Sequence, residues 1–299
     1  MFIIIYLHVQ SEVVKMAEKN MEQPQEGQEA APSADIPQEI IDFNADLANQ
    51  LDMQNEQLQA IENEQKKMPL VGERLPFDII VMEYDEETTA DFLNKAKELS
   101  NTYDEVRQIR GDGNCFYRSV LIGLLEIIGN DQKRAQSFLL EAKAWKNRLI
   151  ELNFPEWTTN DFCDVYIDWL TKVVNNDLSQ QEIKNHLNDD GHANYLIIFM
   201  RLITSGYLKE NRDAYEPFIA SDELTFDEYC AQEVEAMWKD ADHICVQALA
   251  LACKTSLRIE YMDRIAAPNG GWHYDIPEGT TPEICLLYRP GHYDIIYRK

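Results

Sequence analysis

The sequence predicts an α+β domain in which helices pack on an antiparallel sheet, preceded by an N-terminal helical extension. Three observations predict this class. Apolar residues make up 45% of the 299 residues, which is enough for a sizeable core. Apolar spacing is helical over much of residues 89–254, and after that it changes to short strands separated by turn residues. Helices followed by a terminal run of strands are typical of α+β domains.

The first 68 residues divide into two segments. Residues 17–37 are polar, rich in Gln and Glu and interrupted by proline, so we expect residues 1–37 to be a disordered extension. Residues 38–68 contain neither Gly nor Pro and predict a long acidic helix, here called the N-terminal arm. Its apolar residues form one narrow stripe with heptad-like spacing: Ile40, Leu47, Leu51, Leu58 and Ile61. Pro69 ends the arm, and residues 69–299 form the predicted globular domain.

The globular domain is predicted to contain helices first and strands last. Helices are expected at about residues 89–101, 115–128, 132–152, 160–175, 192–206, 226–237 and 242–254. The sixth of these begins at Thr225, with Glu228 three residues later, which is a capping-box signature. Strands are expected at residues 256–262, 283–288 and 292–297, with a turn at residues 289–291.

Charge and cysteine usage exclude several classes of function. Lys and Arg number 27 against 53 Asp and Glu, a formal charge of −26, so the chain repels phosphate backbones and anionic lipid. We therefore expect no nucleic-acid or membrane partner, and no apolar run reaches the roughly 18 residues that span a bilayer. The six cysteines contain no C-x-x-C pair, which predicts no metal site and a reducing compartment, the cytoplasm and also the nucleus.

A glycine-rich segment, GDGNCFYR at residues 111–118, is the first candidate for chemistry. Two glycines in three residues permit a tight turn, and Asn114 is predicted to cap the helix that follows. Cys115 then lies in the first helical turn, where the helix dipole favours a thiolate. Backbone N–H groups in such a loop can form an oxyanion hole. The motif alone leaves open a buried structural cysteine.

The second candidate lies near the end of the chain. His292 and Asp294 alternate on the last predicted strand, so both side chains project from one face. The carboxylate can then orient the imidazole while the other ring nitrogen faces a thiol. The five other histidines lack this combination, although a solvated turn would produce the same two residues.

These two motifs, residues 111–118 and 286–295, closely resemble the otubains, which are cysteine deubiquitinases of the ovarian-tumour protease class with a papain-like catalytic arrangement. Shorter segments also resemble that family, at residues 69–75, 195–196, 202–208, 233–235 and 260–264. The resemblance extends from about residue 40 to the end, and it implies a papain-like fold for residues 69–299. The segment that departs most from the family pattern is residues 266–276.

The resemblance also implies residue roles. Cys115 matches the nucleophile, His292 the general base, and Asp294 the carboxylate that orients it, while Asp112 matches the loop that helps form the oxyanion hole. The implied reaction is hydrolysis of the isopeptide bond between ubiquitin and lysine through a thioester, with no metal or organic cofactor.

The implied partners are ubiquitin, preferably lysine-48-linked polyubiquitin, and a ubiquitin-conjugating enzyme. The N-terminal arm, through Leu47, Leu51, Leu58 and Ile61, matches in place the family helix that helps bind them, and we expect a monomer. Two alternatives stay open at this point. One is a non-catalytic inhibitor of charged conjugating enzymes, and the other is a general papain-type peptidase, which the lack of a secretion signal disfavours.

Overall fold

The computed structural model describes residues 53, 56, 60, 66–219, 224–263 and 272–299. The chain divides into two compact units, Met1–Met68 and Pro69–Lys299. All the elements below belong to the second unit. The four residues proposed for the N-terminal arm's binding stripe lie outside the described residues. Among the described helices, none combines the length and the apolar character that crossing a bilayer requires.

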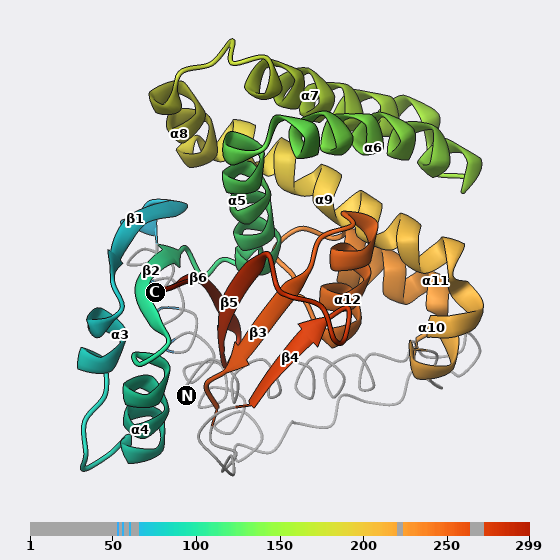
Figure 1. Cartoon of the computed structure of the whole chain (residues 1–299). Helices are drawn as coiled ribbons and strands as arrows, with labels where there is room; N and C mark the ends of the chain where they lie inside the picture. Colours follow the sequence, from blue (N-terminus) through green and yellow to red (C-terminus); the bar gives the residue numbers. More distant parts are fainter. Residues whose placement is uncertain (1–52, 54–55, 57–59, 61–65, 220–223, 264–271) are drawn as a thin grey trace, which may run out of the picture. The chain divides into compact units, whose positions relative to one another are not determined.

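A six-stranded sheet forms the centre of the second unit in the described residues (Figure 1). Its strands are β1 (Val71–Pro76), β2 (Tyr103–Ile109), β3 (Leu257–Tyr261), β4 (Trp272–Ile276), β5 (Ile284–Arg289) and β6 (His292–Arg298). Their order in the sheet is β1-β2-β6-β5-β3-β4. The predicted strands β3, β5 and β6 are confirmed, whereas β1, β2 and β4 were not predicted. The first two are missed because β1 contains Gly and Pro and β2 is largely polar.

The sheet is mixed, whereas the sequence led us to expect an antiparallel one. Only the β3–β5 pair is parallel, with Leu257 opposite Ile284. The reason is the position of β4, which pairs antiparallel with β3 on its outer side. The chain then returns to the inner side of β3, and successive strands alternate in direction, so β5 runs the same way as β3. The α+β class itself is confirmed.

Helices cover both faces of the sheet (Figure 1). One face is covered by α3 (Asp78–Met82) and α4 (Ala90–Leu99), whose apolar residues share a core with Val106, Leu287 and Ile296. The other face is covered by α5 (Cys115–Asn130). Gly123 allows α5 to approach closely, because a Cβ at this position would lie 2.6 Å from the Ile284 side chain. Alternate residues of β5 therefore face different cores, which explains why its first four residues, 284–287, are all buried.

Most of the remaining helices pack around α5 and α9 (Asp190–Glu210), and α12 (His243–Ala252) also lies against β4 (Figure 1). They are α6 (Gln132–Glu151), α7 (Glu156–Val174), α8 (Gln180–Asn188), α9, α10 (Arg212–Ile219), α11 (Phe226–Tyr229), the π-helix η1 (Cys230–Glu235) and α12. The seven predicted helices are confirmed within a few residues at their ends, and α3, α8 and α10 were missed. The capping box of Thr225 and Glu228 is also confirmed.

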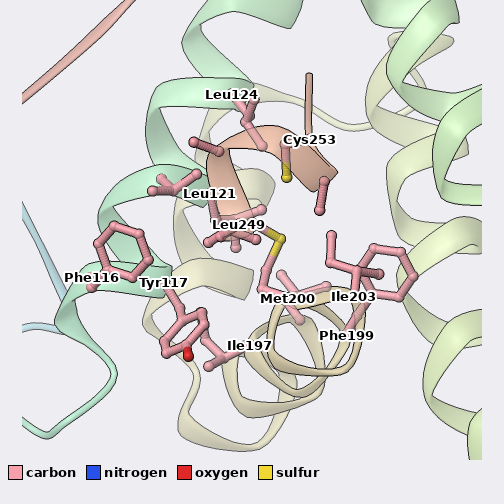
Figure 2. Close-up of a cluster of buried hydrophobic side chains, with 14 of the residues drawn as sticks. Phe116, Tyr117, Leu121, Leu124, Ile197, Phe199, Met200, Ile203, Leu249 and Cys253 are labelled. Carbon is pink, nitrogen blue, oxygen red and sulfur yellow. The ribbon is translucent and has the colours of Figure 1, made fainter. Parts of the chain in front are cut away.

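The main core lies where α5, α9 and α12 meet (Figure 2). Tyr117 of α5, Ile197 of α9 and Leu249 of α12 are among its fully or almost fully buried residues. Because Cys115 is the first residue of α5, this core fixes the helix end on which the candidate nucleophile stands.

Candidate active site

The candidate nucleophile stands at the N-terminus of a buried helix. Cys115 is the first residue of α5 and is 3% exposed. The N–H groups of a first helical turn have no partner within the helix, so they and the helix dipole are available to an anion. The predicted placement of Cys115 in the first helical turn is therefore confirmed.

Asn114 occupies the N-cap position, but its side chain does not cap the helix. The prediction of a side-chain cap is wrong for a physical reason. The Asn114 Oδ1 atom instead accepts hydrogen bonds from the guanidinium of Arg201, at 3.0 Å from Nε and 2.7 Å from Nη2. A charged donor is a stronger partner for this oxygen than a backbone N–H.

The turn before Cys115 requires glycine at position 113. Gly113 has φ +73°, in the left-handed region that side chains disfavour. A Cβ here would lie 2.3 Å from the Trp238 carbonyl oxygen. Both backbone conformation and close packing therefore restrict this position to glycine.

Asp112, predicted to belong to the oxyanion loop, is fixed by Arg118. The two side chains form a bidentate pair, with bonds of 2.9 Å and 2.8 Å. The Asp112 Oδ1 atom also accepts from the Asn114 N–H at 3.0 Å. Asp112 thus holds the loop backbone in place. Its carboxylate is already bonded to Arg118 and to the Asn114 N–H.

The His292 ring and the Asp294 carboxylate meet as the strand spacing predicts. His292 Nε2 lies 2.9 Å from Asp294 Oδ1. This bond leaves Nδ1 as the ring nitrogen for the thiol, and His292 lies close enough to Cys115 to interact with it. The neighbouring residues Phe116 and Tyr293 pack with ring centroids 5.2 Å apart, which joins the start of α5 to β6.

Burial and charge act in opposite directions on this pair. Burial lowers the pKa of His292, but the Asp294 carboxylate and the Cys115 thiol outweigh it and raise the pKa above its ordinary value. Burial likewise tends to raise the pKa of Asp294, but His292, Arg289 and the Ile109 N–H hold it below its usual value. The arrangement therefore favours an imidazolium beside a carboxylate, which is the charge state that a thiolate–imidazolium pair needs.

Asp294 is the centre of a longer charge chain that the sequence did not predict. Its carboxylate is fully buried, pairs with Arg289, and accepts from the Ile109 N–H at 2.9 Å. Arg289 in turn pairs with Glu83, whose side chain is 38% exposed. The charges of Glu83, Arg289, Asp294 and His292 thus alternate in sign from the surface to the buried ring.

The site residues missed in the sequence are Glu83, Ile109, Arg118, Arg201 and Arg289. All but Arg118, which pairs with Asp112 six positions away, have a partner at a long sequence separation. One signal was available, because Arg201 stands in an otherwise apolar stretch of α9. A charge in such a stretch needs buried partners.

Other candidate residues lie away from this cluster. The five remaining cysteines are buried. His186 and His192 contact each other with ring centroids 4.5 Å apart, and His243 packs on Tyr274. Within the described ranges, no group of three or more His, Cys, Asp or Glu side chains is arranged to hold a metal ion.

The chain is similar to known proteins over most of its length. The family model described as Peptidase C65 Otubain matches residues 63–298. The protein named ubiquitin thioesterase otubain-like of Caenorhabditis elegans is 54% identical over 83% of this chain and 88% of its own length. Ubiquitin thioesterase OTUB1 of Homo sapiens is 40% identical over 77% of this chain and 83% of its own length.

Solved structures are similar over the same region. One is a ceOTUB1 ubiquitin aldehyde UBC13~Ub complex, with a TM-score of 0.78 and 54% identity, covering 82% of this chain and 99% of that one. Another is h/ceOTUB1-ubiquitin aldehyde-UBCH5B~Ub, with a TM-score of 0.78 and 51% identity, covering 85% of this chain and 99% of that one.

Proposed function

The chain belongs to the otubain family of peptidases, and from this membership we propose that it is a cysteine deubiquitinase whose nucleophile is Cys115. The observation that carries the proposal is the meeting of three groups from two distant parts of the chain. The thiol stands at a helix N-terminus, the His292 ring lies beside it, and the Asp294 carboxylate orients that ring. This is the arrangement that nucleophilic acyl transfer requires.

The proposed reaction begins with attack of the Cys115 thiolate on the isopeptide carbonyl that joins the ubiquitin C-terminus to a lysine amine. The carbonyl oxygen becomes an oxyanion, which the free N–H groups at the start of α5 stabilise. Protonated His292 gives its proton to the leaving amine, and a thioester remains. His292 then takes a proton from water, which attacks the thioester, releases the ubiquitin C-terminal carboxyl group and restores the thiolate beside the imidazolium.

The proposed partners are ubiquitin and a ubiquitin-conjugating enzyme. The similar solved structures are complexes with ubiquitin aldehyde and with UBC13~Ub or UBCH5B~Ub, which supports both partners for this chain. The formal charge of −26 also suits a partner with a basic face.

A ubiquitin probe with a C-terminal electrophile tests the nucleophile directly. We expect a covalent adduct at Cys115 and none on Cys115→Ala. The other cysteines serve as internal controls, because burial raises the pKa of Cys230 to about 11 and that of Cys245 to about 12. Labelling that persists in Cys115→Ala would refute the assignment.

We further propose that the enzyme prefers lysine-48-linked chains and that the N-terminal arm supplies this preference. A helix with few apolar positions gains most of its stability from packing on a partner, which suits a recognition element. Deleting residues 1–66 should leave the melting temperature and hydrolysis of a small ubiquitin C-terminal ester nearly unchanged. Cleavage of lysine-48-linked di-ubiquitin should fall through a higher KM. Equal losses on both substrates would contradict the proposal.

Non-catalytic inhibition of a charged conjugating enzyme is a second candidate function. It is favoured by the similar complexes that contain a conjugating enzyme linked to ubiquitin. Cys115→Ser separates the two functions, since hydrolysis needs the thiolate whereas binding does not. Inhibition of ubiquitin-chain synthesis by Cys115→Ser, with no cleavage of di-ubiquitin, would establish the second function. Loss of both activities would exclude it.

A further inference from the structure

Arg201 is a completely buried arginine directly behind the nucleophile loop. It lies in the middle of α9, between Met200 and Leu202, and its exposed fraction is 0%. Burying a guanidinium is costly unless its donors are satisfied. The partners of this side chain therefore indicate what it does.

Three of these bonds go to the loop that precedes Cys115. Arg201 Nη2 donates to the Gly113 carbonyl at 2.8 Å and to Asn114 Oδ1 at 2.7 Å, and Nε donates to the same oxygen at 3.0 Å. The Asn114 amide is turned toward the guanidinium even though its Nδ2 then has no acceptor among the described residues. The guanidinium therefore determines the orientation of this amide.

These contacts fix the peptide between Gly113 and Asn114 at both of its polar atoms. Its carbonyl bonds to Arg201, and its N–H bonds to Asp112 Oδ1 at 3.0 Å. In the described part of the chain, the N–H groups of Gly113 and Cys115 have no hydrogen-bond acceptor. They are the donors that an oxyanion hole needs, and their direction follows from the fixed peptide.

The same guanidinium also fixes the segment on the other side of the loop. Nη1 donates to the Val234 carbonyl at 3.0 Å, and Nη2 donates to the Lys239 carbonyl at 2.7 Å. Between these two residues lies Trp238, whose carbonyl contacts Gly113. The Tyr117 ring covers the guanidinium, with 4.2 Å from the Arg201 Cζ atom to the ring centroid. One side chain thus connects α9, the loop, α5 and the chain after η1.

Among the positively charged groups named around the thiol, Arg201 differs in its bonding partners. Arg118 is neutralised by Asp112, and His292 by Asp294. Arg201 forms no ion pair with a carboxylate in the described ranges; its acceptors are carbonyls and an amide. Asp240 also faces the site. It is exposed, its carboxylate lies near Gly291, and it interacts electrostatically with His292 and with Arg201, although it forms no hydrogen bond to either in the described ranges. A buried positive charge without a bonded counter-ion therefore remains beside the place where the thiolate and the oxyanion form.

We propose that Arg201 is a positioning residue for the reaction of Cys115, which orients the oxyanion-binding N–H groups and stabilises the thiolate by its charge. The proposal deepens the proposed function and rests on Cys115 being the nucleophile. A purely structural tie between α9 and the segment after η1 is the competing role.

Alkylation of Cys115 by iodoacetamide distinguishes these roles without any ubiquitin substrate. Mass spectrometry of the Cys115 peptide gives its alkylation rate as a function of pH in the full chain, in Arg201→Met and in Arg201→Lys. We expect Arg201→Met to move the midpoint of this profile to higher pH. The kcat on di-ubiquitin should fall about 10²-fold, the order of one lost oxyanion donor, with a smaller change in KM. For Arg201→Lys we expect an alkylation midpoint and a kcat between those of the wild type and of Arg201→Met. Lysine keeps the positive charge but lacks the planar guanidinium that bonds several acceptors at once.

Arg148→Met is the matched control. Arg148 also stacks on an aromatic ring, Trp145, at 3.5 Å, but its ion pairs are with Glu210 and Glu141 and not with the loop. We expect an unchanged alkylation profile and kcat for this variant. A lower melting temperature in Arg201→Met, with an unchanged profile and an unchanged kcat per folded molecule, would overturn the proposal in favour of the structural tie.

Asn114→Asp keeps the test decisive if Arg201→Met does not fold. The carboxylate keeps the acceptor for Arg201 but neutralises its charge, so the alkylation midpoint should again rise. An unchanged midpoint in a folded Asn114→Asp protein would overturn the role of the charge. If the wild type failed to cleave any di-ubiquitin, the proposed function would fail, but the alkylation comparison would still decide the role of Arg201.

Discussion

The two halves of the candidate active site are held in different ways. The nucleophile loop, residues 111–114, is fixed by buried guanidinium groups that bind its backbone and its amide, and by a glycine that nothing larger can replace. The base hairpin, residues 289–294, is fixed by charges that alternate from Glu83 at the surface to His292 inside. Substitutions that change side-chain size should therefore disturb the loop most. Changes in pH or in side-chain charge should disturb the hairpin most.

Among the predicted variants, removal of the proposed base, His292, should cause the largest loss of activity. His292→Ala eliminates the group that we propose protonates the leaving amine and activates water, so we expect a loss in kcat on the order of 10³-fold or more. Di-ubiquitin cleavage measures this loss, and binding of ubiquitin to the variant provides the control for folding. A loss below tenfold would mean that another group serves as the base.

Gly113→Ala tests the shape sensitivity of the loop. The new Cβ meets the Trp238 carbonyl and forces a left-handed backbone on alanine, which costs about 1–3 kcal/mol in stability. A displaced loop should lower kcat by about 10²-fold, the usual effect of an ångström-scale displacement in a site.

Gly279→Ala is the matched control for Gly113→Ala. Gly279 also has a positive φ, +76°, but a Cβ there would meet no atom within 4 Å. It should lose stability and keep its activity. Equal activities of the two variants would show that the loop tolerates displacement. The proposed difference between a loop held by close packing and a hairpin held by charges would then be wrong.

The sequence predicted the residues whose chemistry depends on local spacing. Cys115 follows from a glycine turn before a helix, and the His292–Asp294 pair from alternation on a strand. Apart from Arg118, which pairs with Asp112 six positions away, the supporting residues could not be predicted, because each has a partner far away in the sequence. Arg201 lies 87 positions from Asn114, and Ile109 lies 185 positions from Asp294. Only the folded topology brings them together.

The same reasoning explains the errors in the fold. Helices were found because their apolar period is internal to each segment. The direction of β5 beside β3 was missed because it depends on where β4 pairs, which no local pattern contains. The binding role of the N-terminal arm stays a prediction.

Asp294→Asn tests the ionisation sensitivity of the hairpin. In the wild type the carboxylate outweighs burial and keeps the pKa of His292 raised. Without that charge the pKa falls, so the imidazolium loses its proton at lower pH. We expect the alkaline limb of the kcat/KM profile to move to lower pH, so that at a pH above the limb the rate falls about tenfold for each pH unit by which the limb moves.

The same variant should change the pH dependence of stability. A raised pKa of His292 contributes stability that is fully present below the unfolded value, and that is lost as pH rises through the folded value. The free energy of unfolding of the wild type should therefore fall on the alkaline side of the ordinary histidine pKa, and Asp294→Asn should show a flatter curve there. Urea titrations at several pH values measure this. Parallel curves would mean that the pair does not stabilise the fold through ionisation.

Glu83→Gln should have the smallest effect, because it alters the exposed end of the charge chain. The Glu83 side chain is 38% exposed, so solvent and salt screen its interaction with Arg289, and such pairs contribute about 1 kcal/mol or less. Arg289 remains paired with the buried Asp294 in this variant, and the imidazole keeps its carboxylate. We expect a decrease in kcat/KM of no more than a few-fold and a small shift of the alkaline limb to lower pH, both vanishing at high salt. Glu86→Gln is the control, since Glu86 forms an exposed pair with Lys97 away from the hairpin. A loss as large as that of Asp294→Asn would show that the hairpin is held from its surface end, and that the buried carboxylate depends on Glu83 rather than on its own contacts with Arg289 and Ile109.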